Sequence, residues 1–190
     1  MQDRYGHRIS YLRVSITDRC NERCTYCMPQ ELQEWLPRHE ILTYEETLRL
    51  IRIAAELGVS KVRITGGEPL TRRGIVDFVR QIPDIPAITS IGLSTNGTLL
   101  AREIAFATTM AEALRDAGVQ SVNISLDTLK ASIYSQITGR DFHAQVLGGI
   151  DAAIVAGFDQ IKLNAVLMRG RNEAELLPLI EFAAARNLLL

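Results

Sequence analysis

The sequence predicts an α/β fold in which parallel βα units form part of a TIM-type barrel. Predicted strands alternate with helical patterns along the chain, which is typical of a parallel sheet covered by helices. Polar residues share one face of several of these strands. The 190 residues suffice for one domain, but a closed eight-stranded barrel typically takes ~250 residues. An open doubly wound sheet is the structural alternative.

The predicted elements follow one another without a linker or a low-complexity stretch. Thr43 begins a helix that ends at Gly58, and Glu46 completes a capping box with Thr43. Strands are predicted at residues 10–17, 61–65, 88–94, 119–126 and 160–168. Further helical segments are predicted at 74–82, from 98 to about 117, in two pieces ending near 157, and at 173–186. We therefore expect one domain over residues 1–190.

The faces of the predicted strands point to a ligand. Arg13, Ser15 and Thr17 share one face by the two-residue period of a strand. The polar residues that share a face in later strands are Lys61, Arg63, Thr65, Asn123, Ser125, Asp127, Lys162 and Asn164. The residues expected to face the helices are Leu12, Val62, Ile64, Val122, Ile124, Ile161 and Leu163. Because unpaired charges inside a barrel are costly, we expect that interior to hold a charged ligand.

Composition and charge exclude several classes of protein. The chain has 21 Lys+Arg and 22 Asp+Glu, a net charge of −1, so a chain-wide basic face for nucleic acid or a membrane surface is not expected. No apolar run approaches the ~18 residues of a membrane-spanning helix, and residues 1–13 lack the apolar core of a secretory signal. We expect a cytoplasmic protein, and a homodimer is compatible with the sequence.

The last residues predict a fragment. Asn187 is followed by three leucines at 188–190, which read as the start of a sixth strand. Natural domains rarely stop at such a point. We therefore expect the chain to lack the C-terminal part of its domain.

The three cysteines, Cys20, Cys24 and Cys27, follow the first predicted strand and are too close and too few for a disulfide framework. Chemistry in α/β folds lies at the carboxyl ends of strands. Three soft thiolates favour an iron–sulfur cluster with one iron open to an exogenous ligand. The alternative, a structural zinc site, needs a fourth protein ligand. The histidines available for that role are His7, His39 and His143.

A second motif, Gly66-Gly67-Glu68-Pro69, follows the second predicted strand. A glycine pair lets a ligand approach the backbone closely, and the Glu68 carboxylate could accept hydrogen bonds from an ammonium group. A tight turn with a solvated glutamate is the alternative.

Basic residues on three strands could form an anion pocket suited to phosphates. These residues are Arg13, Lys61, Arg63 and Lys162. Ordinary ion pairs with acidic residues are the alternative.

Taken together, these residues resemble the radical S-adenosylmethionine (SAM) enzymes. Their signature, Cys-x3-Cys-x-aromatic-Cys, is matched by Cys20, Cys24, Tyr26 and Cys27, and a Gly-Gly-Glu-Pro motif follows the next strand. Within that superfamily the chain is similar to the MoaA family, the GTP 3′,8-cyclases of molybdenum cofactor biosynthesis. The similar blocks are residues 18–29, which end in Met28-Pro29, and residues 63–70, 94–97 and 123–127.

The resemblance implies a lyase reaction and its cofactors. Cys20, Cys24 and Cys27 would hold a [4Fe-4S] cluster whose fourth iron binds SAM. An electron from a donor protein would cleave SAM to a 5′-deoxyadenosyl radical, which would take hydrogen from C3′ of GTP and lead to attack on guanine C8. This would be the first step of molybdopterin biosynthesis, and the enzyme that rearranges the product would be a downstream partner.

The resemblance also implies roles for individual residues. The positions that contact SAM in the family match Tyr26, Gly67 and Ser125, with Glu68 next to Gly67. The positions that contact GTP match Arg13, Arg63, Ser94 and Lys162, and Lys61 is expected to help at the triphosphate.

The chain departs from the family pattern in three places. Ser94 replaces the usual threonine and keeps the hydroxyl, and residues 103–110 look like an insertion that extends a helix. The C-terminal region, with a second [4Fe-4S] cluster, is absent, so we expect this chain not to complete the cyclisation alone. The alternative functions are another radical SAM enzyme, such as a peptide-modifying one, and a non-catalytic metal-binding module.

Overall fold

Five parallel strands form the main sheet of the computed structural model, which describes residues 2–28 and 34–190. They lie in the order β1 (Tyr11–Ser15), β2 (Lys61–Thr65), β3 (Ser90–Thr95), β6 (Ser121–Ser125) and β7 (Gln160–Asn164). Each pairs with its neighbour in parallel. The carboxyl ends of the strands therefore meet at one edge of the sheet, and the predicted βα units are confirmed.

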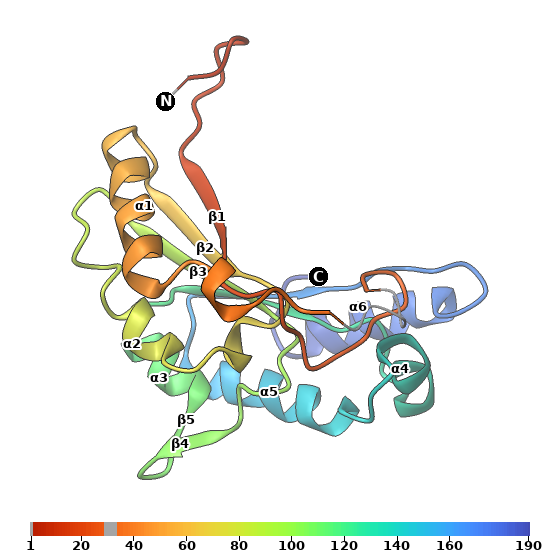
Figure 1. Ribbon diagram of the computed structural model, residues 1–190. Helices are drawn as coiled ribbons and strands as arrows, with labels where there is room; N and C mark the ends of the chain where they lie inside the picture. The colour runs from red at the N-terminus through yellow and green to blue at the C-terminus, as the bar shows by residue number, and fades with distance from the viewer. Residues whose placement is uncertain (1, 29–33) are drawn as a thin grey trace.

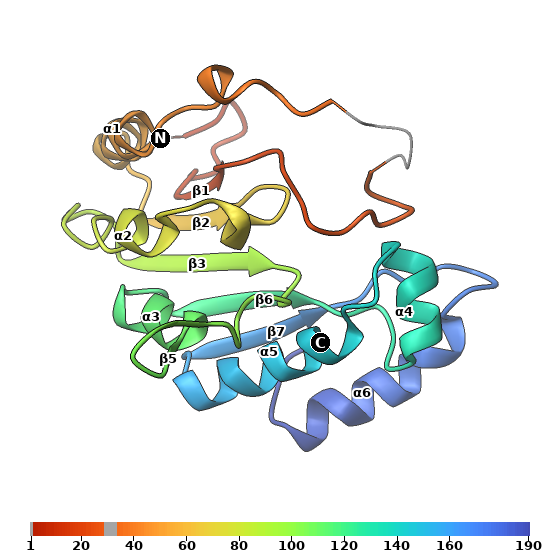
Figure 2. The same ribbon diagram turned by 60° about the horizontal axis from the view of Figure 1, so that its bottom comes forward.

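Helices connect these strands along one face of the sheet (Figures 1 and 2). They are α1 (Tyr44–Glu56), α2 (Ile75–Val79), α3 (Met110–Asp116), α4 (Ala131–Thr138), α5 (His143–Ala156) and α6 (Leu176–Ala185). Short 3-10 helices are η1 (Arg38–Glu40), η2 (Pro69–Thr71) and η3 (Glu173–Glu175). Helix α1 begins as predicted, because Thr43 and Glu46 each accept a hydrogen bond from the other's backbone N–H. No helix in the described part of the chain is long and apolar enough to cross a membrane.

The two faces of the sheet differ in burial. The residues predicted to face the helices are buried or partly buried, including Val62, Ile64, Val122, Ile124 and Leu163 in the core. Alternate residues on the other face, such as Arg13, Lys61 and Ser125, are exposed. A doubly wound sheet would carry helices on both faces, so that alternative is wrong and the sheet is that of a partial barrel.

The leucines at the C-terminal end extend the sheet as predicted. Leu189 forms a parallel bridge with Lys162 beside β7. The Leu163 N–H donates to the Leu189 carbonyl at 2.8 Å, and the Leu189 N–H donates to the Ile161 carbonyl at 3.1 Å.

The continuous helix predicted to run to about residue 117 is wrong. Residues 103–109 form an antiparallel hairpin of β4 (Glu103–Ala105) and β5 (Thr108–Thr109), and α3 begins only at Met110. Phe106 and Ala107 have φ angles of 44° and 62°, a left-handed conformation that a right-handed helix cannot contain. The signal for the later start is a capping box formed by Thr109 and Glu112.

Candidate functional site

A cavity of about 260 Å³ at the carboxyl edge of the sheet brings together most of the predicted site residues. The cysteine loop after β1 and all five main strands contribute to its walls. The predicted residues that line it are Arg13, Cys20, Cys24, Tyr26, Cys27, Gly67, Ser94 and Ser125. Residues far apart in sequence therefore meet where the period-two pattern predicted a ligand.

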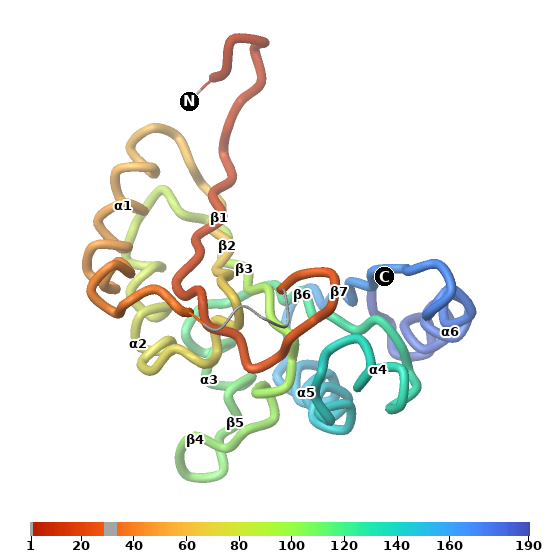
Figure 3. The backbone as a smooth tube through the Cα atoms, turned by 45° about the vertical axis from the view of Figure 1, so that its right-hand side comes forward, coloured from red at the N-terminus to blue at the C-terminus, as the bar shows by residue number. Residues whose placement is uncertain are grey.

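The cysteine loop is held in place from the far half of the sheet. Figure 3 shows the chain after β1 crossing towards the ends of β6 and β7. The Tyr26 hydroxyl donates to Asp127 Oδ2 at 2.7 Å. The backbone N–H groups of Arg23 and Thr25 donate to the carbonyls of Thr138 (2.8 Å) and Ile137 (2.9 Å) at the end of α4. These bonds fix the loop on both sides of Cys24.

Glu22 and Tyr134 are site residues that sequence reasoning missed. Both line the cavity and both are buried. The Tyr134 hydroxyl donates to Glu22 Oε1, while the Cys24 thiol lies 3.6 Å from Glu22 Oε2. Burial raises the pKa of Glu22, although these hydrogen bonds oppose the shift. The position of Glu22 between two cysteines was a signal, whereas nothing in the sequence relates it to Tyr134.

The glycine pair allows the turn after β2 to pack closely against the segment that precedes Cys20. The Gly67 N–H donates to the Thr17 carbonyl and the Glu68 N–H donates to the Arg19 carbonyl, both at 2.7 Å. A Cβ on Gly67 would lie 2.4 Å from the Arg19 carbonyl oxygen. Glycine is therefore required for the close backbone packing of this turn against the segment that leads into Cys20.

Glu68 is buried rather than solvated, so that alternative is wrong. It is 1 % exposed. Its Oε1 accepts from the Leu70 N–H (3.0 Å) and the Thr95 hydroxyl (2.8 Å), and its Oε2 accepts from the Asn96 N–H (2.7 Å). Burial raises the pKa of Glu68 to about 7. The carboxyl group thus ties the turn after β2 to the end of β3, and binding of an ammonium group by Glu68 stays a prediction.

Arg63 lies on the open face of the sheet but does not line the cavity. Its guanidinium donates to the Tyr11 hydroxyl (2.8 Å), the Leu93 carbonyl (2.8 Å) and the Ser121 hydroxyl (3.1 Å). A Cβ on Gly92 would lie 2.7 Å from this guanidinium. The absence of a side chain at Gly92 therefore allows Arg63 to lie flat across β3.

The remaining predicted basic residues differ in their relation to the cysteines. Lys61 and Lys162 lie on the same open face as Arg63 and do not line the cavity, whereas Arg13 does. Within residues 2–28 and 34–190, none of these four basic side chains forms an ion pair. The ion-pair alternative is therefore not supported there, and their positive charges face the open side of the sheet.

The cysteines fit an iron–sulfur cluster by the type of donor and by their shared cavity. In the described part of the chain, no three Cys, His, Asp or Glu side chains are already gathered at metal-binding distances. Burial raises the pKa of Cys20 to about 11 and also raises the pKa of Cys24, so metal binding would release their protons. The cavity residues include none of the three histidines considered for a zinc site.

Comparison with known proteins agrees with this arrangement. The GTP 3′,8-cyclase of Pelotomaculum thermopropionicum is 47% identical over 188 residues, which are 99% of this chain and 56% of the relative. The GTP 3′,8-cyclase of Pseudomonas fluorescens is 46% identical over 186 residues, which are 98% of this chain and 54% of the relative. The chain thus spans about half the length of these curated relatives.

Solved structures of radical SAM enzymes share the fold. Streptococcus suis SuiB bound to S-adenosylmethionine superposes with a TM-score of 0.73 at 20% identity, covering 94% of this chain and 39% of SuiB. The [FeFe]-hydrogenase maturase HydG superposes with a TM-score of 0.70 at 20% identity, covering 92% of this chain and 38% of HydG. The family model of the radical SAM superfamily matches residues 14–183. This chain belongs to the radical SAM superfamily.

Proposed function

We propose that this chain is the SAM-cleaving part of a GTP 3′,8-cyclase that acts in molybdenum cofactor biosynthesis. The observation that carries this proposal is the 46–47% identity, over nearly the whole chain, to enzymes of that name. The shared cavity of the three cysteines with Arg13, Ser94 and Ser125 supports it. Residues 1–190 would form the core domain, and the second cluster would belong to the part of the relatives that this chain does not span.

Cys20, Cys24 and Cys27 would hold the [4Fe-4S] cluster, which together with SAM supplies the radical chemistry of the superfamily. Tyr26 and Ser125 line the same cavity as the cysteines and would contact SAM. The hydrogen bond from Tyr26 to Asp127 restrains the cysteine loop against the end of β6. Gly67 lines the same cavity and is exposed there, so its backbone would be accessible to the cofactor.

The open face of the sheet would hold GTP. Arg13, Arg63 and Lys162 would bind the triphosphate, with Lys61 as a helper, because no carboxylate of the described residues neutralises them. Arg63 is held by three acceptors from β1, β3 and β6 and is therefore oriented before substrate arrives. Ser94 lies at the cavity wall with Arg13 and the cysteines, and would offer its hydroxyl to the nucleotide.

The proposal also entails partners. An electron donor would reduce the cluster, and the enzyme that rearranges the cyclised product would act next, both in the cytoplasm. The alternative function, a peptide-modifying radical SAM enzyme, gains no support from the structural neighbours. Their identity of about 20% shows the fold alone.

The test is the GTP dependence of SAM cleavage by the anaerobically reconstituted chain. We expect 5′-deoxyadenosine formation to increase with GTP and not with CTP, and R13Q and K162Q to lose that increase. R52Q is the matched control, because Arg52 is an exposed residue of α1. SAM cleavage that proceeds at the same rate with and without GTP would overturn the assignment of substrate.

A further inference from the structure

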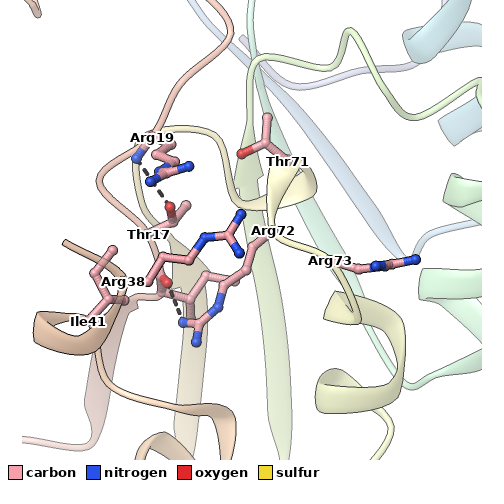
Figure 4. A pocket seen from close by; sticks show the side chains of 8 residues that line it. Thr17, Arg19, Arg38, Ile41, Thr71, Arg72 and Arg73 are labelled. Carbon is pink, nitrogen blue, oxygen red and sulfur yellow. Dashed lines mark hydrogen bonds between the residues drawn. The ribbon is translucent and has the colours of Figure 1, made fainter. Parts of the chain in front are cut away.

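A second cavity is separate from the one that holds the cysteines, and four of the eight residues that line it are arginines (Figure 4). Its volume is about 360 Å³, and its walls come from the segment before Cys20, from η1 and from the turn after η2. Arg19, Arg38, Arg72 and Arg73 line it, and no described lining residue is acidic. Since the whole chain carries a net charge of only −1, this is a marked local concentration of positive charge.

Arg72 is a fixed charge at the base of the cavity. Its guanidinium donates to the Ile16 carbonyl and to the Leu42 carbonyl (2.7 Å), and it lies 4.1 Å from the centre of the Tyr44 ring. Carbonyl acceptors orient a guanidinium without neutralising it. The positive charge of Arg72 is therefore held in position and remains available to an anion.

Arg19 and Arg38 line the same cavity as Arg72. Within the described residues, neither side chain takes part in an ion pair, and both are exposed. Figure 4 shows both guanidinium groups on the same side of the turn as Arg72. Three like charges around one cavity create a positive potential that attracts an anion.

The remaining arginine extends the positive surface. Figure 4 shows the Arg73 side chain directed away from the other three. Arg73 also lines a neighbouring cavity together with Arg102, and no described residue of that lining is acidic either. The positive region therefore continues past the turn, which suits an anion with more than one charged group.

We propose that the cavity around Arg19, Arg38 and Arg72 binds the phosphate groups of a small oligophosphate anion. Guanidinium groups bind phosphate oxygens through paired N–H donors, and a cavity of this volume is in the range that accommodates small molecules. The site is distinct from the strand-end residues proposed for GTP. Thr17 and Arg19 line it, so a bound anion would lie against the backbone that leads into Cys20 and packs on Gly67.

The test is calorimetric titration of the metal-free chain with inorganic diphosphate at constant ionic strength, with sulfate as the reference anion. We expect saturable binding of one diphosphate per chain, weakened about tenfold by R38Q and by R19Q because each removes charge-assisted hydrogen bonds. Neither side chain forms a hydrogen bond in the described structure, so both variants should fold, which circular dichroism checks. R80Q is the matched control, because Arg80 is exposed and pairs with Asp77 outside the cavity.

The source of the phosphate is decided by competition with ATP. If ATP displaces diphosphate, the phosphates of a nucleotide are an occupant of the cavity. If ATP does not displace it, the occupant is free diphosphate. Either result supports the site. Diphosphate binding that sulfate matches at equal ionic strength would overturn the proposal. Binding that R13Q and K162Q abolish while R38Q and R19Q leave it intact would also overturn it, and would leave the proposed function standing.

Discussion

Tyr26 and Asp127 are joined by a hydrogen bond of 2.7 Å between the phenol oxygen and Oδ2, although 101 positions separate them in the sequence. The other carboxylate oxygen, Oδ1, accepts from the Val166 N–H at 2.8 Å. The Asn172 side chain donates to the carbonyl of the same aspartate at 2.8 Å. Asp127 therefore connects the cysteine loop to the segments that follow β6 and β7.

Replacing Tyr26 by Phe tests this connection. The substitution keeps the ring and removes the only donor to Oδ2 that the described residues provide to Asp127, which is 5 % exposed. We expect Y26F to lower the free energy of unfolding by about 1 kcal/mol, as measured by urea denaturation. Y5F is the control, because Tyr5 is 70 % exposed. Equal losses of stability in Y26F and Y5F would contradict the connection.

Gly67→Ala tests the close packing of the two loops. The added Cβ would meet the Arg19 carbonyl at 2.4 Å, so the turn must move away from the segment before Cys20. We expect a loss of about 2 kcal/mol in unfolding free energy and less iron and sulfide bound per chain after reconstitution.

The matched control for Gly67 is Gly148 in α5, where an added Cβ would meet nothing within 4 Å. G148A should raise stability by up to ~1 kcal/mol, because alanine favours a helix over glycine. The two substitutions are thus expected to have opposite signs. A G67A chain as stable as G148A would show that the turn has room that the structure does not show.

The contacts of the Glu175 carboxylate predict that the stability of the chain depends on pH. Lys130 Nζ lies 2.8 Å from Oε1, and Oε2 accepts from the Thr128 hydroxyl (2.9 Å) and the Leu129 N–H (3.0 Å). The Lys130 contact is the main cause that lowers the pKa of Glu175 below its ordinary value of 4.5. Because the folded-state pKa is the lower one, the stabilisation is present above pH 4.5 and is lost as the pH falls through the folded-state pKa.

The corresponding variant is Glu175→Gln. At pH 7 it should lower the free energy of unfolding by about 1 kcal/mol, since the amide keeps only part of these hydrogen bonds. Below pH 4.5 its stability should fall less steeply than that of the unmodified chain. Denaturation of both chains at pH 7 and at a pH below 4.5 measures these free energies of unfolding. If the two chains lose the same stability between these pH values, Glu175 is not the source of the pH dependence.

Thr109→Ala tests where α3 begins. The Thr109 hydroxyl accepts from the Glu112 N–H at 3.2 Å, and the Glu112 carboxylate accepts from the Thr109 N–H at 2.7 Å. Loss of this N-cap should cost about 1 kcal/mol, as measured by thermal or urea unfolding. Thr108 lies next to it in β5 and is not the cap, so T108A should cost less. In a continuous helix through residue 103 neither threonine would be a cap, and both substitutions would raise stability, because alanine favours a helix over threonine.

The strands and their faces follow from the sequence because local pattern and burial agree there. Lys61–Thr65 forms β2 as predicted, since alternate residues Val62 and Ile64 must be buried whichever way the helices pack. The hairpin at residues 103–109 could not be predicted in the same way. Its left-handed positions are occupied by Phe106 and Ala107 rather than by glycine or asparagine, so no turn signal marks it.

The candidate site also contains residues that the sequence predicts and contacts that it does not. Arg13 and Ser125 were found from strand periodicity and Ser94 from the family resemblance, and the structure places all three at the cavity wall. The burial of Glu68 and the pairing of Glu22 with Tyr134 depend on how separate loops meet. Such contacts join residues far apart in the chain, and no local pattern records them.

The most direct test of the central claim is electron paramagnetic resonance of the anaerobically reconstituted and reduced chain, recorded with and without SAM. If Cys20, Cys24 and Cys27 hold a cluster with one open iron, the chain gives a [4Fe-4S]⁺ signal that changes when SAM is added. C24A then loses the signal and remains folded. A folded chain that gives no cluster signal and binds one zinc without sulfide would contradict the claim.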